Sequence, residues 1–431
     1  MIARNRRKRS WIAAAVLVAG SLVATSLPAH AETGVTASEI KLGITLPLTG
    51  SASPGYNKVG DAMKAYFNYV NDNGGVYGRK INLVIKNDEY LPSLAIAKTN
   101  ELILKDKVFA LVGALGTANH EAVANSVGLA RRGIPDLFIS TGFSGFADKK
   151  KFPTTFPIFP SYVMEAKIMG QYLKDTYAGK KLGIIYQDDD FGSDALKGFA
   201  QAGVKFDVSV PYASGSQSQT TAATWISKLA AGGAEVVVVF GVTSAAGLAL
   251  AVAGGAKYAP KWILGSVSGD ATTLKALGVP AAVLTGAQGA SFLPSPADTT
   301  DEYVKLFQEV NTKYNNNVAF DNNVLVAMNT AMVTVQALRA AGSNLSRKGL
   351  ISAIQKKGST FASAALVPLN YSATSQVGYN GYWFGQYDST GAMKPLATGV
   401  VVYTTDSGSG AVVKSTFKRP AMPAKGLPTN S

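Results

Sequence analysis

The chain has no cysteine among its 431 residues. That absence excludes disulfide bonds, thiolate nucleophiles and cysteine-based metal sites. Histidine is nearly as scarce, and two histidines, His30 and His120, leave little scope for histidine-dependent catalysis or metal binding. Charged residues make up only 16% of the chain, whereas hydrophobic residues make up 47%. This composition is typical of a well-packed globular protein, and the length indicates two domains.

The first 31 residues have the pattern of a cleaved signal peptide. A basic start precedes the apolar stretch 11–27, and Ala29-His30-Ala31 fits a cleavage site between small residues. A retained membrane anchor is the alternative, but the stretch is short for a span and glycine, serine, threonine and proline interrupt it. No cysteine follows the cleavage site. We therefore expect an exported protein at the periplasmic or extracellular face of the cytoplasmic membrane, without a lipoprotein anchor.

The charge balance is basic but shows no nucleic-acid signature. Removing the five basic residues of the leader leaves 36 basic and 27 acidic side chains, or about +9. These positive charges are scattered, and neither a basic helix nor an aromatic-basic motif is present. We expect a solvated basic surface and no nucleic-acid partner.

The stretch 40–90 contains a complete β-α-β unit. Residues 41–46 alternate as a strand does and run into Pro47-Leu-Thr-Gly50, a loop of small residues. Apolar residues then recur at helical spacing from Val59 to Val70, and Asn71-Asp-Asn-Gly-Gly75 ends that helix. Residues 81–86 form the second strand. Two strands joined by a helix form a right-handed crossover whose carboxyl ends face a ligand crevice.

Four short motifs of this unit, in this order and spacing, resemble one family. They are Pro47-Leu-Thr-Gly50, Asn71-Asp-Asn-Gly-Gly75, Gly78-Arg-Lys80 and Asn87-Asp88. The chain resembles the leucine/isoleucine/valine-binding family of extracytoplasmic solute-binding proteins of ABC importers over about residues 38–390. The resemblance implies an α/β fold with two doubly wound, Rossmann-like lobes joined by three hinge crossings, the type I periplasmic-binding fold.

The remaining pattern of strands, helices and loops predicts how the chain divides. We expect an N-terminal lobe from 38–158 with 290–366 and a C-terminal lobe from 159–289 with 367–417. The proline-rich segment 149–160 is the first predicted crossing, 291–296 after a strand at 283–288 is the second, and 366–369 is the third. The tail 418–431 contains several prolines and no apolar period, so we expect it to be disordered.

Two loops are candidate carboxylate sites. The loop 113–120 leaves a strand and opens a helix, which directs backbone N–H groups and the helix dipole into the crevice. By the resemblance, Thr117 and Ala118 take the positions that bind a ligand α-carboxylate, and Gly142 and Ser144 form the second carboxylate loop. The alternatives are a helix cap at Thr117 and a turn built from small residues near Gly142.

Other positions follow from the same resemblance. Tyr56 and Phe191 fall where the family places aromatic rings over the ligand, and Thr243 falls where amino-acid binders often carry tyrosine. The family's ammonium-binding glutamate is expected near Ser268, yet Val267 and Ser268 stand there. A buried ammonium without a carboxylate is costly. Asp270, or one of the aspartates at 188–190, is a candidate replacement, and the other interpretation is a ligand without an ammonium group.

No enzyme motif accompanies these positions. The aspartates at 188–190 suit a divalent ion or acid-base chemistry, but three adjacent carboxylates in one loop are more typical of a solvated turn. No Walker loop, dinucleotide fingerprint or hydrolase elbow is present. The sequence predicts a monomeric binding protein without catalytic residues, metal or cofactor. The resemblance implies that it delivers its solute to ABC permease transmembrane subunits driven by a cytoplasmic ATPase. The alternative is a ligand sensor that signals to a membrane receptor.

Overall fold

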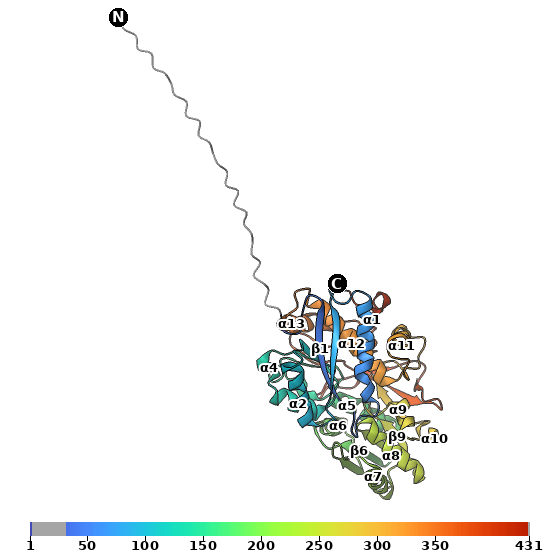
Figure 1. Ribbon diagram of the computed structural model, residues 1–431. Coiled ribbons are helices and arrows are strands. Elements are labelled where there is room, and N and C mark those ends of the chain that lie inside the picture. Colours follow the sequence, from blue (N-terminus) through green and yellow to red (C-terminus); the bar gives the residue numbers. More distant parts are fainter. Residues whose placement is uncertain (2–31, 430–431) are drawn as a thin grey trace. The chain divides into compact units, whose positions relative to one another are not determined.

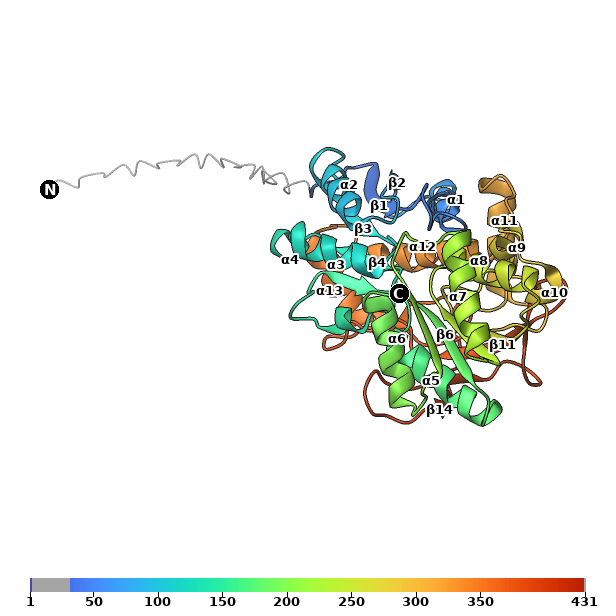
Figure 2. The same cartoon turned by 90° about the horizontal axis from the view of Figure 1, so that it is seen from below.

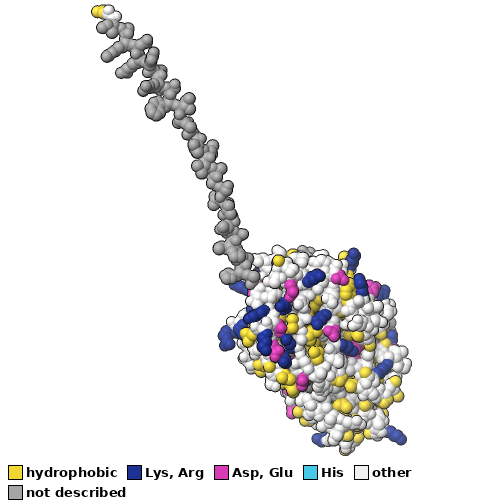
Figure 3. All heavy atoms as spheres, viewed as in Figure 1, with side chains coloured by type: hydrophobic (Ala, Val, Ile, Leu, Met, Phe, Trp, Pro, Cys, Tyr) yellow, Lys and Arg dark blue, Asp and Glu magenta, His cyan; other side chains and the backbone are white. Residues whose placement is uncertain are grey.

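Two twisted sheets organise the computed structural model, which describes Met1 and residues 32–429 (Figures 1 and 2). The predicted signal peptide lies outside the described residues. Within the described part, no helix has both the length and the apolar character that a membrane crossing needs. Lysine and arginine side chains are interspersed with aspartate and glutamate on the face shown in Figure 3.

The first sheet is wholly parallel, in the order β2-β1-β3-β4-β5. Its strands are β1 (Glu39–Leu46), β2 (Lys80–Asn87), β3 (Ala110–Val112), β4 (Asp136–Ile139) and β5 (Thr155–Pro157). One group of helices packs around α1 and another around α2, on either side of the sheet (Figure 1). The first group is α1 (Val59–Asp72), α11 (Glu302–Tyr314), α12 (Asn322–Ala340) and α13 (Arg347–Lys357); the second is α2 (Pro92–Leu104), α3 (Thr117–Ser126) and α4 (Leu129–Arg132).

The second sheet runs in the order β7-β6-β8-β9-β10-β11-β13-β14, and β12 pairs with β11. It is parallel as far as β10 and antiparallel from β11 onward. Its strands are β6 (Leu182–Gln187), β7 (Val208–Tyr212), β8 (Val236–Phe240), β9 (Lys261–Leu264), β10 (Gln288–Ser291), β11 (Tyr382–Tyr387), β12 (Met393–Pro395), β13 (Val402–Thr404) and β14 (Val413–Lys414). Its helices are α5 (Tyr162–Thr176), α6 (Asp190–Gln201), α7 (Gln219–Ala231), α8 (Thr243–Gly255), α9 (Ala271–Ala276) and α10 (Ala281–Leu284).

Local sequence explains why these elements form where they do. All five residues of β8 are apolar and buried, as a strand covered on both faces requires. Ser218 begins α7 through a reciprocal capping box with Thr221, which satisfies amides that the first helical turn leaves free. Helix α12 is buried on nearly all sides, which suits its mostly apolar sequence and its place between α1 and α13.

The two predicted doubly wound α/β lobes are present. The chain passes from the first sheet to the second after β5, returns after β10, and passes again before β11. The strand expected at 283–288 is wrong in position. Pro280 caps the short helix α10, and the strand starts only at Gln288. The predicted lobe boundaries remain a proposal, and the one between 289 and 290 falls inside β10 of the second sheet.

Residues 418–429 of the tail make defined contacts, whereas the sequence predicts disorder from 418 onward. After β14 the chain leaves the second sheet and packs against α1 and α11 of the first lobe. The Arg419 guanidinium donates to the Asp301 carboxylate at 2.5 Å and lies over the Tyr303 ring. The Tyr66 hydroxyl donates to the Gly426 carbonyl oxygen at 2.5 Å in the short helix η4 (Ala424–Gly426). Such long-range contacts with the lobe cannot be read from the tail's composition.

Candidate functional site

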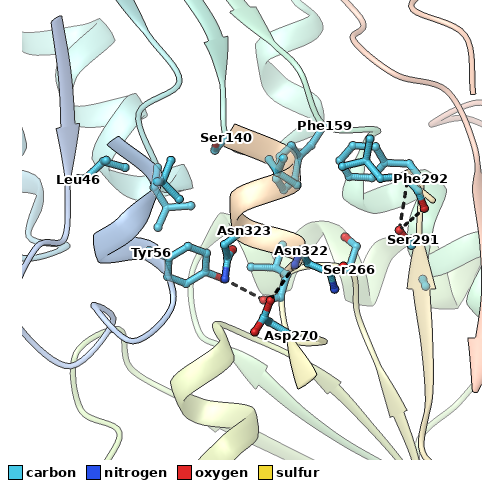
Figure 4. A pocket seen from close by; sticks show the side chains of 16 residues that line it. Leu46, Tyr56, Ser140, Phe159, Ser266, Asp270, Ser291, Phe292, Asn322 and Asn323 are labelled. Atoms are coloured by element: carbon cyan, nitrogen blue, oxygen red, sulfur yellow. Dashed lines mark hydrogen bonds between the residues drawn. The ribbon is translucent and has the colours of Figure 1, made fainter. Parts of the chain in front are cut away.

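The carboxyl ends of the parallel strands of both sheets meet at the boundary between the lobes. In the first sheet, the chain leaves β1 toward β2 on one side and leaves the neighbouring β3 toward β4 on the other side. In the second sheet, it likewise leaves β6 toward β7 and the neighbouring β8 toward β9. Such a switch point leaves a crevice outside the strand ends, where α/β proteins bind ligands. Leu46, the last residue of β1, lies in the wall of a cavity at this place (Figure 4).

Both lobes and the crossings contribute side chains to this cavity. Its volume is about 50 Å³, well below the roughly 300–1,000 Å³ common in ligand sites, so an occupant requires the lobes to separate slightly. The apolar lining is Leu46, Val59, Leu115, Phe159, Val267, Ala290, Phe292, Leu293 and Val326, and the polar lining is Tyr56, Ser140, Ser266, Asp270, Ser291, Asn322 and Asn323. Figure 4 shows Tyr56, Asn322, Asn323 and Asp270 close together, away from Leu46 and Phe292.

Asp270 supplies the carboxylate of the cavity wall. Its Oδ1 accepts from the Thr273 amide at 2.6 Å, which caps α9, and its Oδ2 accepts from the Asn322 amide at 3.1 Å. Burial raises the pKa of nearby Asp321 to about 6, the Asp270 charge adds to that rise, and the ion pair with Lys58 opposes it. Two carboxylates and one ammonium therefore make this corner of the cavity acidic.

Ser266 is held by a carboxylate that does not itself line the cavity. Glu165, in the first turn of α5, accepts from the Ser266 amide at 2.5 Å and from the Ser266 hydroxyl at 2.9 Å. Glu165 is only 1% exposed. Burial raises its pKa to about 7, and the two Ser266 bonds oppose that rise.

The predicted carboxylate-binding residues lie beside the cavity, although Leu115 of the first loop lines its wall. Thr117 begins α3, and its hydroxyl is 2.7 Å from that of Thr141; Ala118 follows it in the helix and is half-buried. The Gly142 carbonyl oxygen accepts from the Tyr162 amide at 2.8 Å. These loop residues therefore bond to neighbouring loop and crossing residues in this closed arrangement.

Ser144 joins the two lobes directly. Its amide and hydroxyl donate to the carboxylate of Asp194 in α6 at 2.6 and 2.9 Å. Glu121 of α3 also faces α6, where burial and the Asp190 carboxyl raise its pKa to about 7. Contacts of this kind exist only while the lobes are closed, so they favour closure.

Three further predicted residues lie in two places. The Tyr56 hydroxyl donates to the Val267 carbonyl oxygen at 2.9 Å. The Thr243 hydroxyl lies 3.3 Å from the Tyr56 hydroxyl, so both residues lie at the lobe boundary. Phe191 is buried against the rings of Tyr162 and Phe240, at 4.5 and 5.1 Å between centroids.

Ser268 is fully buried. Its hydroxyl bonds to the carbonyl oxygens of Val239 and Gly241, so it ties the strand ends together instead of lining the cavity. Of the predicted site residues, the structure brings Tyr56 and Asp270 together in the cavity wall.

Sequence reasoning missed several cavity residues. Asn322 and Asn323 begin α12, more than 260 residues after Tyr56, and Ser140 ends the strand before the second predicted loop. The predicted start of the second helix after the second crossing was the signal for the asparagines. No local signal existed for Glu165, since its relation to Ser266 spans 101 residues.

The described residues offer few side chains suited to catalysis or metal binding. The His120 ring bonds to the Gly116 carbonyl oxygen at 3.1 Å, and its other nitrogen lies 3.6 Å from Asp136. Gly116 itself has φ +111°, and a side chain there would meet the Tyr90 ring. Over residues 32–429, no group of three histidine, aspartate or glutamate side chains is arranged to hold a metal ion.

A family model described as periplasmic binding protein matches residues 39–392, most of the chain. The chain belongs to the periplasmic binding protein family. One curated relative, a Leu/Ile/Val-binding protein homolog of Brucella melitensis, is 22% identical over 227 residues. That alignment spans 49% of this chain and 56% of the relative, so it covers about half of each.

Solved structures show the same fold as this periplasmic binding protein. A branched-chain amino acid ABC transporter protein from Thermus thermophilus with bound valine has a TM-score of 0.74 at 18% identity, covering 86% of this chain and 98% of that one. A fatty acid ABC transporter substrate-binding protein from Thermomonospora curvata has a TM-score of 0.72 at 22% identity, covering 85% and 94%. The resemblance to the leucine/isoleucine/valine-binding proteins is thereby confirmed at the level of family and fold.

Proposed function

We propose that this periplasmic binding protein captures a small solute outside the cytoplasmic membrane for an ABC importer. The observation that carries the proposal is the cavity at the lobe boundary, whose wall combines both lobes and the crossings. A solute held there contacts the second lobe only when the lobes close, so binding energy drives closure. The closed form then docks on the transmembrane permease, and a cytoplasmic ATPase supplies the energy of transport.

The solute we propose carries a carboxylate and is an amino acid of the branched-chain type, or a related amide or aromatic acid. The apolar wall, including Val59, Phe159 and Phe292, suits an aliphatic or aromatic body. Asp270 offers a carboxylate to an ammonium group. The first amides of α3, at Thr117 and Ala118, lack intrahelical acceptors and lie in the loop that follows Leu115, where a carboxylate is favoured.

The remaining parts of the proposal follow from the family and the sequence. The chain acts as a monomer, is exported without a lipid anchor, and binds its solute without chemical conversion. Its nine predicted ligand-binding residues retain that assignment as a proposal, with Tyr56 and Asp270 contacting the solute directly.

Calorimetric titration of refolded residues 32–431 tests this function. Leucine, isoleucine and valine are compared with phenylacetate and benzoate, after refolding has removed co-purified solute. We expect micromolar or tighter binding of at least one compound, together with a smaller radius of gyration in X-ray scattering. Silence from the whole panel would refute the proposed solute class.

A cavity-filling variant locates the binding. Ala290→Phe places a ring in the cavity wall, and Ala259→Phe places the same ring in an exposed loop. We expect the first substitution to abolish binding and the second to leave it unchanged. Equal affinities in the two variants would place the solute elsewhere.

A further inference from the structure

The last part of the described chain connects the two lobes once more, after the three crossings. Strands β13 and β14 belong to the second sheet, and the Ser415 amide still donates to the Val402 carbonyl oxygen at 2.8 Å. Arg419 already bonds to the first lobe. Residues 416–418 alone separate these two attachments. We call residues 405–429 the strap.

Arg419 fixes the strap to the first lobe. Its guanidinium donates to the Asp301 carboxylate at 2.5 Å and to the Ala364 carbonyl oxygen at 2.8 Å. Asp301 caps α11, which follows the second crossing, and Ala364 lies just before the third crossing. Hydrogen bonds between ionised groups are among the strong ones. One side chain therefore ties the strap to the first-lobe ends of two crossings.

The segment after Arg419 extends this attachment. The Met422 amide donates to the Glu302 carboxylate at 2.9 Å, and the Tyr69 hydroxyl donates to the Lys425 carbonyl oxygen at 2.6 Å. These bonds reach α11 and α1, which both belong to the first lobe. The strap is thus held at several points along the first lobe.

Lys167 of α5 fixes the other end of the strap to the second lobe. Its side chain is only 5% exposed. The ammonium group donates to the Asp406 carboxylate at 3.0 Å and to the carbonyl oxygens of Gly408 and Gly410 at 2.7 and 2.8 Å. These acceptors form the loop between β13 and β14. Because a buried ammonium is costly unless it is paired, the lysine and the loop hold each other in place.

The strap is offset from the three crossings. Strands β13 and β14 lie beyond β11 at the edge of the second sheet, and neighbouring strands are about 4.8 Å apart. A groove of about 540 Å³ is lined by Phe417 and Arg419 of the strap and by Pro294 and Leu366 of the crossings. A rotation of the lobes about the crossings therefore changes the distance that the strap spans. The chain from Ser415 to Arg419 reaches about 14 Å at most, which leaves little slack.

We propose that the strap is a fourth hinge connection, which limits how far the two lobes rotate relative to each other. The family match ends at residue 392, so the strap lies outside it. A narrower range of lobe arrangements reduces the entropy that is lost when the lobes close on a solute. The strap acts on the lobes whatever the solute is, so this inference goes beyond the proposed function.

Interlobe distances measured without solute test the strap. Because the chain has no cysteine, Asn125→Cys in α3 and Ala200→Cys in α6 carry spin labels without background, and both positions are exposed. Double electron–electron resonance on refolded residues 32–431 then gives the distribution of distances between the lobes. With an intact strap, we expect at most about 10% of the molecules outside the main distance peak.

A slackened strap is the decisive variant. Inserting Gly-Ser-Gly-Ser after Thr416 adds about 13 Å of reach and retains every residue that anchors the strap. The control is the same insertion after Gly179, in an exposed turn of the second lobe where nothing lies within 4 Å. We expect the share of molecules outside the main peak to rise several-fold with the first insertion and to stay unchanged with the second.

Arg419→Gln releases the first-lobe end of the strap. Its matched control is Arg347→Gln, because both arginine side chains are 18% exposed. Arg347 also donates to two carbonyl oxygens, those of Val108 and Phe109, but both lie in the first lobe. We expect Arg419→Gln to widen the distance distribution as the slackened strap does, and Arg347→Gln to leave it unchanged.

Lys167→Met releases the second-lobe end and keeps an unbranched side chain in place of the buried lysine. Lys174→Met in the same helix is the control, since Lys174 is exposed and donates to the Ala202 carbonyl oxygen within the second lobe. The insertion and the two anchor variants decide independently, so loss of folding in one leaves the others informative. Distributions that match the wild type in the variants that fold would overturn the inference. A wild-type distribution as broad as that of the slackened strap would overturn it too.

Discussion

Glu165 has a buried carboxyl whose ionisation the fold opposes, and this predicts how stability depends on pH. Its pKa rises from 4.5 to about 7 because burial penalises the charged form. The contribution of this group to stability is therefore fully present below about pH 4.5 and is lost as the pH rises through about 7. A rise of about 2.5 pKa units corresponds to about 3 kcal/mol between those limits.

Glu165→Gln removes this titration while keeping a hydrogen-bonding side chain of the same size. We expect the free energy of unfolding of the variant, relative to the wild type, to increase by up to about 3 kcal/mol between pH 4.5 and pH 8. Urea unfolding followed by tryptophan fluorescence at several pH values measures this difference. Glu235→Gln is the control, since that glutamate is exposed and its pKa is lowered by the hydrogen bond from Lys180.

Two outcomes contradict this reasoning. Wild-type and Glu165→Gln stabilities that run parallel across the pH range would show that the carboxyl titrates normally. A difference that grows toward acid pH would show that the ionised form is stabilised, and the assignment of burial as the dominant cause would be wrong.

Further substitutions test the tail, a helix start and the lobe contact. Gly426 has a positive φ of +61°, and Gly426→Ala places a methyl group 2.0 Å from a leucine side chain. We expect the free energy of unfolding in urea to fall by about 1–3 kcal/mol. Gly399→Ala, where nothing lies within 4 Å, is the control and should cause a smaller fall. Ser218→Ala removes the capping box of α7 and costs about 1 kcal/mol, and a cost near zero would show that the box contributes nothing. Asp194→Ala removes both bonds from Ser144, so we expect a larger radius of gyration in X-ray scattering without solute; an unchanged radius would show that other contacts hold the lobes closed.

The lobes and their order were readable from the sequence because their signals are local. The run of apolar residues in β8, the helical spacing in α1 and the loop at Asn71–Gly75 each depend on residues a few positions apart. A right-handed crossover then leaves few ways to connect such elements. The misplaced strand near Pro280 shows the limit, since an apolar run alone does not separate a short helix from a strand.

Tertiary structure decided which residues line the cavity and which hydrogen bonds they make. The sequence placed Asp270 and Tyr56 near the crevice, but it gave no sign that Glu165 holds Ser266 or that Asn323 faces the same cavity. The tail was likewise misjudged, because Tyr66 and Gly426 are separated by 360 positions. Hydrogen bonds between distant residues decide which donors and acceptors remain for a solute, and no local pattern records them. The sequence by itself determined the family, the fold and the edge of the sheets where we propose that a solute binds, whereas the polarity of the cavity arose only from folding.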